Sequence, residues 1–134
     1  MLCKFVVGAT IQKWEVHILD VDLPENFLPN FIGKARYLGV DLADPIVKVH
    51  EQMVLRDIYT EAQKNDVKFL FFIIRDCSPS YSYPEMKALQ QEFGIATQEL
   101  RGSTATRRCG PQTIQNLICK MNHKNGGINY AEQH

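Results

Sequence analysis

Apolar and polar positions along this chain change their spacing repeatedly, in a pattern that alternates strand with helix. The clearest strand is a continuous apolar run at 69–74, bounded by polar residues, as in a central parallel strand covered on both faces. Stretches 14–21, 46–49 and 95–100 also read as strands, and residues 5–7 read as an extended piece before the first.

Four amphipathic segments with helical spacing fill the intervals between and after these strands. Pro29, Pro84 and Pro111 mark the beginnings of three of them, and Gly39 and Gly94 mark two of the ends. The segment before 69–74 ends near residue 65, and the last one ends at the glycine pair 126–127. The residues predicted to face the core are Phe31, Ile32, Ala35 and Leu38; Val54, Leu55, Ile58 and Ala62; Met86, Leu89 and Phe93; and Ile114, Leu117, Ile118 and Met121.

This alternation predicts an α/β fold, a Rossmann-like sandwich with a small, largely parallel central sheet flanked by helices. With 134 residues and 45% hydrophobic composition, we expect one domain over 1–134. Ligands of such sheets bind beyond the carboxyl ends of the strands, against helix N-termini. We therefore expect a crevice built from residues 75–83, the region of Gln98 and the last helix, with an Arg/Ser/Thr-rich loop between 101 and 110.

Charge and cysteine content narrow the classes of function. The formal net charge is zero, so a phosphate would have to bind at one focused site rather than in a general basic field. The four cysteines form no Cys-x-x-Cys pair, and the four histidines show no pairing with cysteine or carboxylates that suggests a metal or catalysis. Without a signal peptide or an apolar run long enough for a bilayer, we expect reduced thiols, a cytoplasmic location and no membrane partner.

The last predicted helix carries a polar stripe that has the character of an anion site. Asn116, Lys120 and Lys124 recur at four-residue intervals, so they share one face, opposite the apolar one. Two ammonium groups one turn apart repel each other unless an anion lies between them. A solvated polar face is the alternative, and the spacing alone leaves it open.

A second pair of residues is spaced one helical turn apart in the segment that begins near Pro84. Tyr83 there offers a flat ring for stacking and a hydroxyl for a phosphate oxygen, and Lys87 follows one turn later. A helix N-terminus adds free N–H groups and partial positive charge. Capping or packing by Tyr83 is the alternative. Together the two helices indicate a pocket for a phosphate with a base attached.

These residues resemble motifs of the Mid domain of eukaryotic Argonautes. Tyr83-Pro-Glu-Met-Lys87 resembles the family's Tyr-x-x-x-Lys motif, residues 94–98 resemble the segment after it, and residues 111–129 resemble the final helix. The resemblance is strong over roughly 69–130; before that, the order of elements and Trp14 in the first strand agree. Tyrosine rather than histidine at the stacking position is similar to the Argonaute subfamily, not the Piwi subfamily.

The resemblance implies a domain that binds the 5′ end of a small guide RNA and catalyses nothing. Tyr83 would stack under the first base, Thr97 would help through its backbone, and no cofactor or obligatory Mg²⁺ is expected because three lysines can replace the metal. The residues implied to surround the 5′-phosphate are Tyr83, Lys87, Gln98, Asn116, Lys120 and Lys124.

In the family, the loop before Tyr83 reads the edge of the first base, and here it is longer than usual. We expect it to set base preference, with uridine preferred. Its residues are Asp76, Cys77, Ser78, Pro79, Ser80, Tyr81 and Ser82.

The resemblance also implies a Piwi domain of the same polypeptide as a partner, because an Argonaute would continue into Piwi after residues 126–127. Any RNA cleavage would belong to that absent domain, and part of the phosphate pocket would come from it, so the isolated domain should bind modestly.

Two other classes of function stay open from the residues alone. A nucleotide-handling enzyme would need a glycine-rich phosphate loop or clustered carboxylates, and only Asp76 offers a nucleophile or metal ligand. A protein-interaction or nucleotide-sensing α/β module is the other. Arg101, Arg107 and Arg108 would contact later guide phosphates, keep a mobile loop soluble, or bind a second anion near Lys124.

Overall fold

The structure, a computed structural model, describes residues 4–107 and 109–130, so Cys3, Arg108 and His134 lie outside it. The elements in chain order are β1 (Thr10–Ile11), β2 (Trp14–Leu19), α1 (Phe27–Leu38), β3 (Asp41–Leu42), β4 (Ile46–His50), α2 (Leu55–Lys64), β5 (Phe69–Ile74), α3 (Tyr83–Phe93), β6 (Ala96–Arg101), α4 (Gly102–Arg107) and α5 (Pro111–Lys124).

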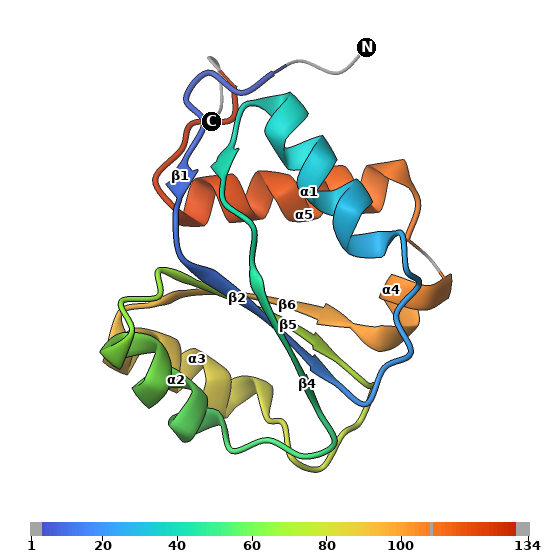
Figure 1. The fold of residues 1–134 in the computed structure, drawn as a ribbon, viewed down its shortest axis with the longest axis vertical. Helices are drawn as coiled ribbons and strands as arrows, with labels where there is room; N and C mark the ends of the chain where they lie inside the picture. Colours follow the sequence, from blue (N-terminus) through green and yellow to red (C-terminus); the bar gives the residue numbers. More distant parts are fainter. Residues whose placement is uncertain (1–3, 108, 131–134) are drawn as a thin grey trace.

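The main sheet has four parallel strands in the order β4-β2-β5-β6, with α1 and α5 on one face and α2 and α3 on the other (Figure 1). A second, two-stranded parallel sheet joins β1 to β3. The predicted α/β sandwich is confirmed. The apolar run at 69–74 is β5, which is buried along its whole length between β2 and β6.

Each face of the sheet has its own hydrophobic core because side chains of a strand alternate between its faces. Phe69, Phe71 and Ile73 pack with residues of α1 and α5. The other three residues of β5 pack with residues of α2 and α3. Because β5 is apolar along its whole length, its side chains pack against the helices on both faces of the sheet.

The predicted loop at 101–110 is wrong in its first part, because Gly102–Arg107 forms the short helix α4. Asp76 caps its first turn from a distant loop: Ser103 donates to the Asp76 carboxylate from its backbone N–H at 3.1 Å and from its hydroxyl at 2.7 Å. Gly102 lets the helix begin close to the end of β5, since a Cβ there would lie 2.8 Å from Val21 Cγ2 and 3.3 Å from the Ile74 carbonyl oxygen. Neither contact is visible in the local sequence.

Smaller differences have local causes. Strand β2 stops at Leu19, short of residue 21, because Asp20 adopts a left-handed φ of 52°. Val54 precedes α2 and is exposed rather than inward. Helix α1 begins at Phe27, before Pro29, and residues 5–7 form no strand beyond an isolated bridge from Val7 to Ile128.

Asn122, which the sequence analysis missed, fixes the end of α5 to the N-terminal segment. It is fully buried, its Oδ1 accepts from the Ala9 N–H at 2.7 Å, and its Nδ2 donates to the Val7 carbonyl and to Asn129 Oδ1. A Cβ at Gly127 would lie 2.3 Å from the Asn122 amide, so this turn requires glycine. This junction positions the last turn of α5, which carries Lys124.

On the face of β2 that is turned away from α1 and α5, a buried histidine pairs with a buried carboxylate. The sequence did not predict this pair. His17 Nε2 lies 2.7 Å from Glu15 Oε1, and its Nδ1 lies 2.8 Å from Nε2 of His50 on β4. Lys48 donates to the second Glu15 oxygen at 3.4 Å. Burial lowers the pKa of His17 to about 4, although the Glu15 hydrogen bond acts in the opposite direction.

This shift predicts acid destabilisation. Between pH 6.5 and about 4, the unfolded chain binds a proton at His17 more readily than the folded chain does. The free energy of unfolding is therefore largest above pH 6.5 and decreases as the pH falls through this range. The loss should reach at most about 3 kcal/mol. Urea unfolding at a series of pH values measures it. His17→Gln should reduce the decrease in unfolding free energy between pH 6.5 and about 4. His123→Gln, on the exposed face of α5, should leave that decrease as it is in the wild type. The same dependence on pH in all three proteins would contradict the assignment to His17.

Candidate phosphate and base site

The N-terminus of α3 presents Tyr83 to solvent. Ser82 caps this helix, since its hydroxyl accepts from the Glu85 N–H at 3.3 Å, and Pro84 occupies the first turn. Tyr83 itself is 51% exposed. Neither capping nor core packing therefore accounts for Tyr83, and its ring is open to a stacking partner.

Lys87 lies one turn further along the same face of α3. Its Nζ is 5.5 Å from the centroid of the Tyr83 ring, within the range of a cation–π interaction. The ring and the ammonium group thus form one surface, as the spacing predicted.

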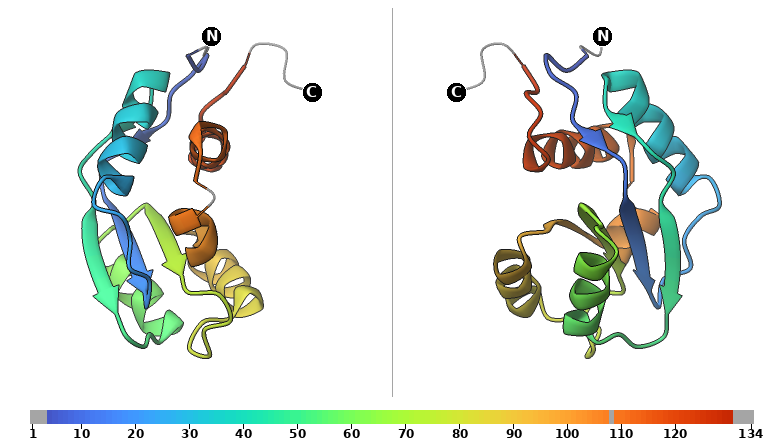
Figure 2. Two further views of the ribbon diagram at one scale, coloured as in Figure 1. Left: turned by 90° about the vertical axis from the view of Figure 1, so that its right-hand side faces the viewer. Right: turned by 60° about the vertical axis from the view of Figure 1, so that its left-hand side comes forward.

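Lys124 reaches this region from the end of α5. Its Nζ donates to the Thr97 carbonyl oxygen and to Gln98 Oε1, each at 2.8 Å. The residue as a whole is exposed, but its ammonium group is partly withdrawn beside the outer edge of β6. In the left view of Figure 2, α5, α4 and α3 lie one below another along one side of the molecule.

Burial and the charges of Lys87 and Lys120 act on Lys124 and lower its pKa. It is lowered from the ordinary 10.5 to about 8, first by burial and then by the positive charges of Lys87 and Lys120. Three ammonium groups from two separate helices therefore share one region. This is the arrangement on which a terminal-phosphate site depends.

Gln98 and Thr97 enter this region by holding Lys124, whereas Asn116 lies further off. Asn116 is exposed, and its Oδ1 accepts from Gln112 of the same helix at 2.9 Å. It stands two turns before Lys124, about 12 Å along the axis. It is also one turn from Lys120 on the same face of α5, so its part in the phosphate site stays a prediction.

The predicted base-specificity loop is held at both ends. Asp76 is tied to α4 through Ser103, and the Tyr81 hydroxyl donates to Glu99 Oε2 of β6 at 2.8 Å. Burial, together with the neighbouring Glu99 carboxylate, raises the pKa of Tyr81. Between this loop and β6 is a hollow of about 240 Å³, whose lining includes Tyr81, Tyr83, Glu99 and Arg101.

The predicted crevice is thus divided into two adjacent parts. The hollow lies at the carboxyl ends of β5 and β6, where such sheets bind ligands. The lysine cluster lies beside the outer edge of β6. Of the three arginines, Arg101 lines the hollow and Arg107 ends α4 on the surface; Arg108 is outside the described residues.

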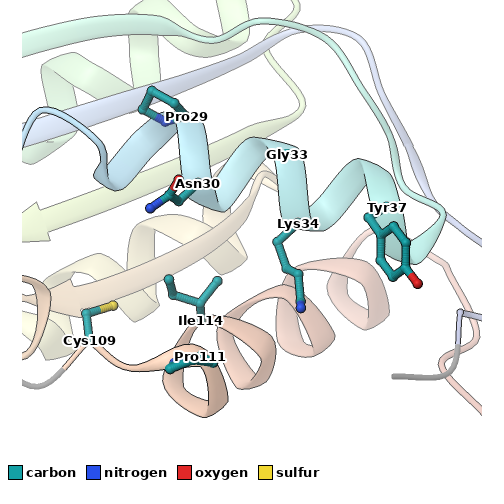
Figure 3. A pocket seen from close by; sticks show the side chains of 8 residues that line it. All are labelled: Pro29, Asn30, Gly33, Lys34, Tyr37, Cys109, Pro111 and Ile114. Atoms are coloured by element: carbon teal, nitrogen blue, oxygen red, sulfur yellow. The ribbon is translucent and has the colours of Figure 1, made fainter. Parts of the chain in front are cut away.

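A larger groove of about 900 Å³ separates α1 from the beginning of α5 (Figure 3). Lys34 and Tyr37 of α1 face it from one side and Ile114 of α5 from the other. None of the predicted phosphate or base residues lines it.

No three His, Cys, Asp or Glu side chains within 4–107 and 109–130 are grouped so that they could hold a metal ion. No helix in that part of the chain combines the length and the apolar character needed to cross a bilayer.

Solved structures share this fold. The MID domain of Arabidopsis thaliana AGO5 superposes with a TM-score of 0.75 and 23% identity, over 96% of this chain and 98% of that one. The MID-PIWI domains of the N. crassa QDE-2 AGO superpose with a TM-score of 0.65 and 15% identity, over 95% of this chain and 38% of that one.

Sequence comparison also finds argonaute proteins, although no protein-family model matches the chain. Argonaute 4B of Oryza sativa subsp. japonica is 27% identical over 140 residues, covering 94% of this chain, and argonaute-2 of Drosophila melanogaster is 31% identical over 80 residues, covering 60%. The chain spans only 15% and 6% of the lengths of these relatives. The predicted resemblance is confirmed: this chain has the fold of an Argonaute MID domain and is similar in sequence to two argonaute proteins.

Proposed function

We propose that this domain binds the 5′-phosphate and first base of a small guide RNA, as part of an Argonaute-type silencing protein. The observation that carries the proposal is the convergence of Lys87, Lys120 and Lys124 beside the exposed ring of Tyr83. Similarity to argonaute proteins supports the guide-RNA role, and the arrangement of charges supports its 5′ end as the part that is bound.

The three positive charges of the lysine cluster favour a ligand group that carries two negative charges. A terminal phosphate monoester carries close to two negative charges near neutral pH and offers three acceptor oxygens. An internal phosphodiester carries one charge, and esterification blocks a further oxygen. Three ammonium groups that repel one another when the site is empty gain most from the doubly charged group, without requiring a bound Mg²⁺.

The base would stack on Tyr83. Base–aromatic stacking contributes about 1–3 kcal/mol and tolerates every base. It adds affinity without selecting a sequence, so any base preference must come from the walls of the hollow beside Tyr83.

Further parts of the proposal concern the parent protein. A Piwi domain in the same polypeptide would complete the pocket and carry any cleavage, and the MID-PIWI arrangement named for the N. crassa structure supports such a neighbour. Asp76, the candidate nucleophile, is engaged by Ser103, which favours a structural role. Membership of the Argonaute rather than the Piwi subfamily, and a cytoplasmic location, stay predictions.

Lys120→Ala tests the phosphate site. We expect it to weaken binding of 5′-phosphorylated RNA about tenfold or more, the size of a lost charge-assisted contact, and to change binding of the same RNA with a 5′-hydroxyl little. Fluorescence anisotropy with both RNAs measures this. Lys64→Ala, an equally exposed lysine at the end of α2, is the matched control. Equal losses for both RNAs in the Lys120 variant would count against the proposal.

A further inference from the structure

A carboxylate stands in the wall of the hollow beside the proposed stacking ring. Glu99, half-buried on β6, and Tyr83 line the same hollow of about 240 Å³. The position is unexpected in a site for a polyanion, because a carboxylate repels phosphate. Its place with the ring, rather than among the three lysines, suggests a role toward the base.

Glu99 is held in one orientation. Its Oε2 accepts from the Tyr81 hydroxyl at 2.8 Å, and Tyr81 packs its ring against Phe72, 6.1 Å between centroids. Within residues 4–107 and 109–130, the Tyr81 hydroxyl is the one donor to this carboxylate, so Oε1 keeps its acceptor capacity.

Arg75 and Asp76, two of the other charged residues of the hollow, have partners outside it. Arg75 pairs with Asp20 at 2.7 Å, and Asp76 accepts two hydrogen bonds from Ser103. Arg101 lies close enough to Asp76 to contribute to the lowering of the Asp76 pKa. Glu99 Oε1 thus has no donor among residues 4–107 and 109–130 and belongs to the same hollow as Tyr83.

We propose that Glu99 makes this site select a first base whose pairing edge carries an amino group, as in cytosine or adenine, over one that carries a carbonyl oxygen there, as in uracil. This rests on the proposed function. A carboxylate accepts a hydrogen bond from an exocyclic amine and repels a carbonyl oxygen at the same position. The inference departs from the uridine preference expected from the sequence.

Two matched ligand pairs exchange the amino group for an oxo group, and with it the adjacent ring nitrogen changes from an acceptor to an N–H donor. Cytidine and uridine 5′-monophosphates differ at the 4-position, amino against oxo, and adenosine and inosine 5′-monophosphates differ in the same way at the 6-position. Titration of the wild-type domain should show the amino member bound about five- to twentyfold more tightly in both pairs. Equal binding, or tighter binding of uridine and inosine monophosphates, would overturn the proposal.

Glu99→Gln keeps an acceptor for the Tyr81 hydroxyl but can also present an amide N–H to a carbonyl. It should weaken binding of the amino members and strengthen binding of the oxo members, so that the preference disappears or reverses in both pairs. A preference that persists in this variant would assign the selection to the loop backbone instead of Glu99.

Lys120→Ala separates this inference from the function on which it rests. If it weakens all four monophosphates alike, the phosphate site stands and the ranking of bases decides the role of Glu99. If the wild-type domain binds the four monophosphates with no dependence on Lys120, the proposed function itself fails.

Discussion

Lys124→Met is expected to weaken binding of 5′-phosphorylated RNA by about 2–5 kcal/mol, or roughly thirty- to several-thousand-fold. Lys124 connects the lysine cluster to the sheet, because its ammonium group donates to Thr97 and Gln98 of β6 and stands within reach of the charges of Lys87 and Lys120. Methionine keeps most of the side-chain length and removes the charge. Isothermal titration with 5′-phosphorylated and 5′-hydroxyl RNA measures the loss.

The pH dependence of binding gives this prediction a second test. In the free domain Lys124 loses its proton near pH 8, so affinity for phosphate should fall as pH rises through 8. A bound anion raises the pKa, so binding above pH 8 should take up a proton. Below about pH 6 the phosphate dianion takes up a proton and becomes a monoanion, which weakens binding as well.

The methionine variant should lack the decline above pH 8, and Lys64→Met should keep it. A wild-type affinity that stays flat from pH 7 to 9.5 would show that Lys124 does not contribute its charge to the phosphate.

Gly8→Ala is expected to destabilise the fold by more than about 4 kcal/mol, enough to leave much of the protein unfolded. The chain at Gly8 crosses the end of α1, and an added Cβ would lie 1.7 Å from the Gly39 carbonyl oxygen and 2.5 Å from its carbon. Gly39 cannot move aside easily, because it caps α1 with a φ of 114° and its N–H is bonded to the carbonyl oxygens of Ala35 and Arg36.

The chain supplies a matched control for that substitution. Gly33 lies inside α1, and a Cβ there would meet nothing within 4 Å. Gly33→Ala should therefore stabilise the domain by about 0.5–1 kcal/mol, the helix-propensity gain of alanine over glycine. Urea unfolding of both variants checks the pair; a Gly8→Ala protein as stable as the wild type would mean that the crossing is not as close as described.

Several features of the fold were predictable because their causes are local. The continuous apolar run that forms β5 and the glycines that end α1 and α3 act through neighbours within a few residues. Helix α4 and the Asn122 junction were missed because their partners are far away in the chain: Asp76 for α4, and Val7 and Ala9 for Asn122.

The candidate site also has a part that follows from local sequence and a part that depends on residues far away in the chain. The pairs Tyr83–Lys87 and Lys120–Lys124 follow from the one-turn repeat of a helix. Their approach to each other depends on β6, which runs between α3 and α5 and supplies the oxygens that hold Lys124. The orientation of Glu99 depends on a hydroxyl eighteen positions earlier in the chain.

By itself, then, the sequence determined the alternating elements, both core faces of β5 and the residue types of a phosphate and base site. The tertiary structure alone decided that Thr97 and Gln98 of β6 hold Lys124, and that the Glu99 carboxylate lines the same hollow as Tyr83. The physical reason is that periodicity places side chains relative to their own helix or strand, whereas the distance between two helices is set by strand order and by packing across the whole sheet.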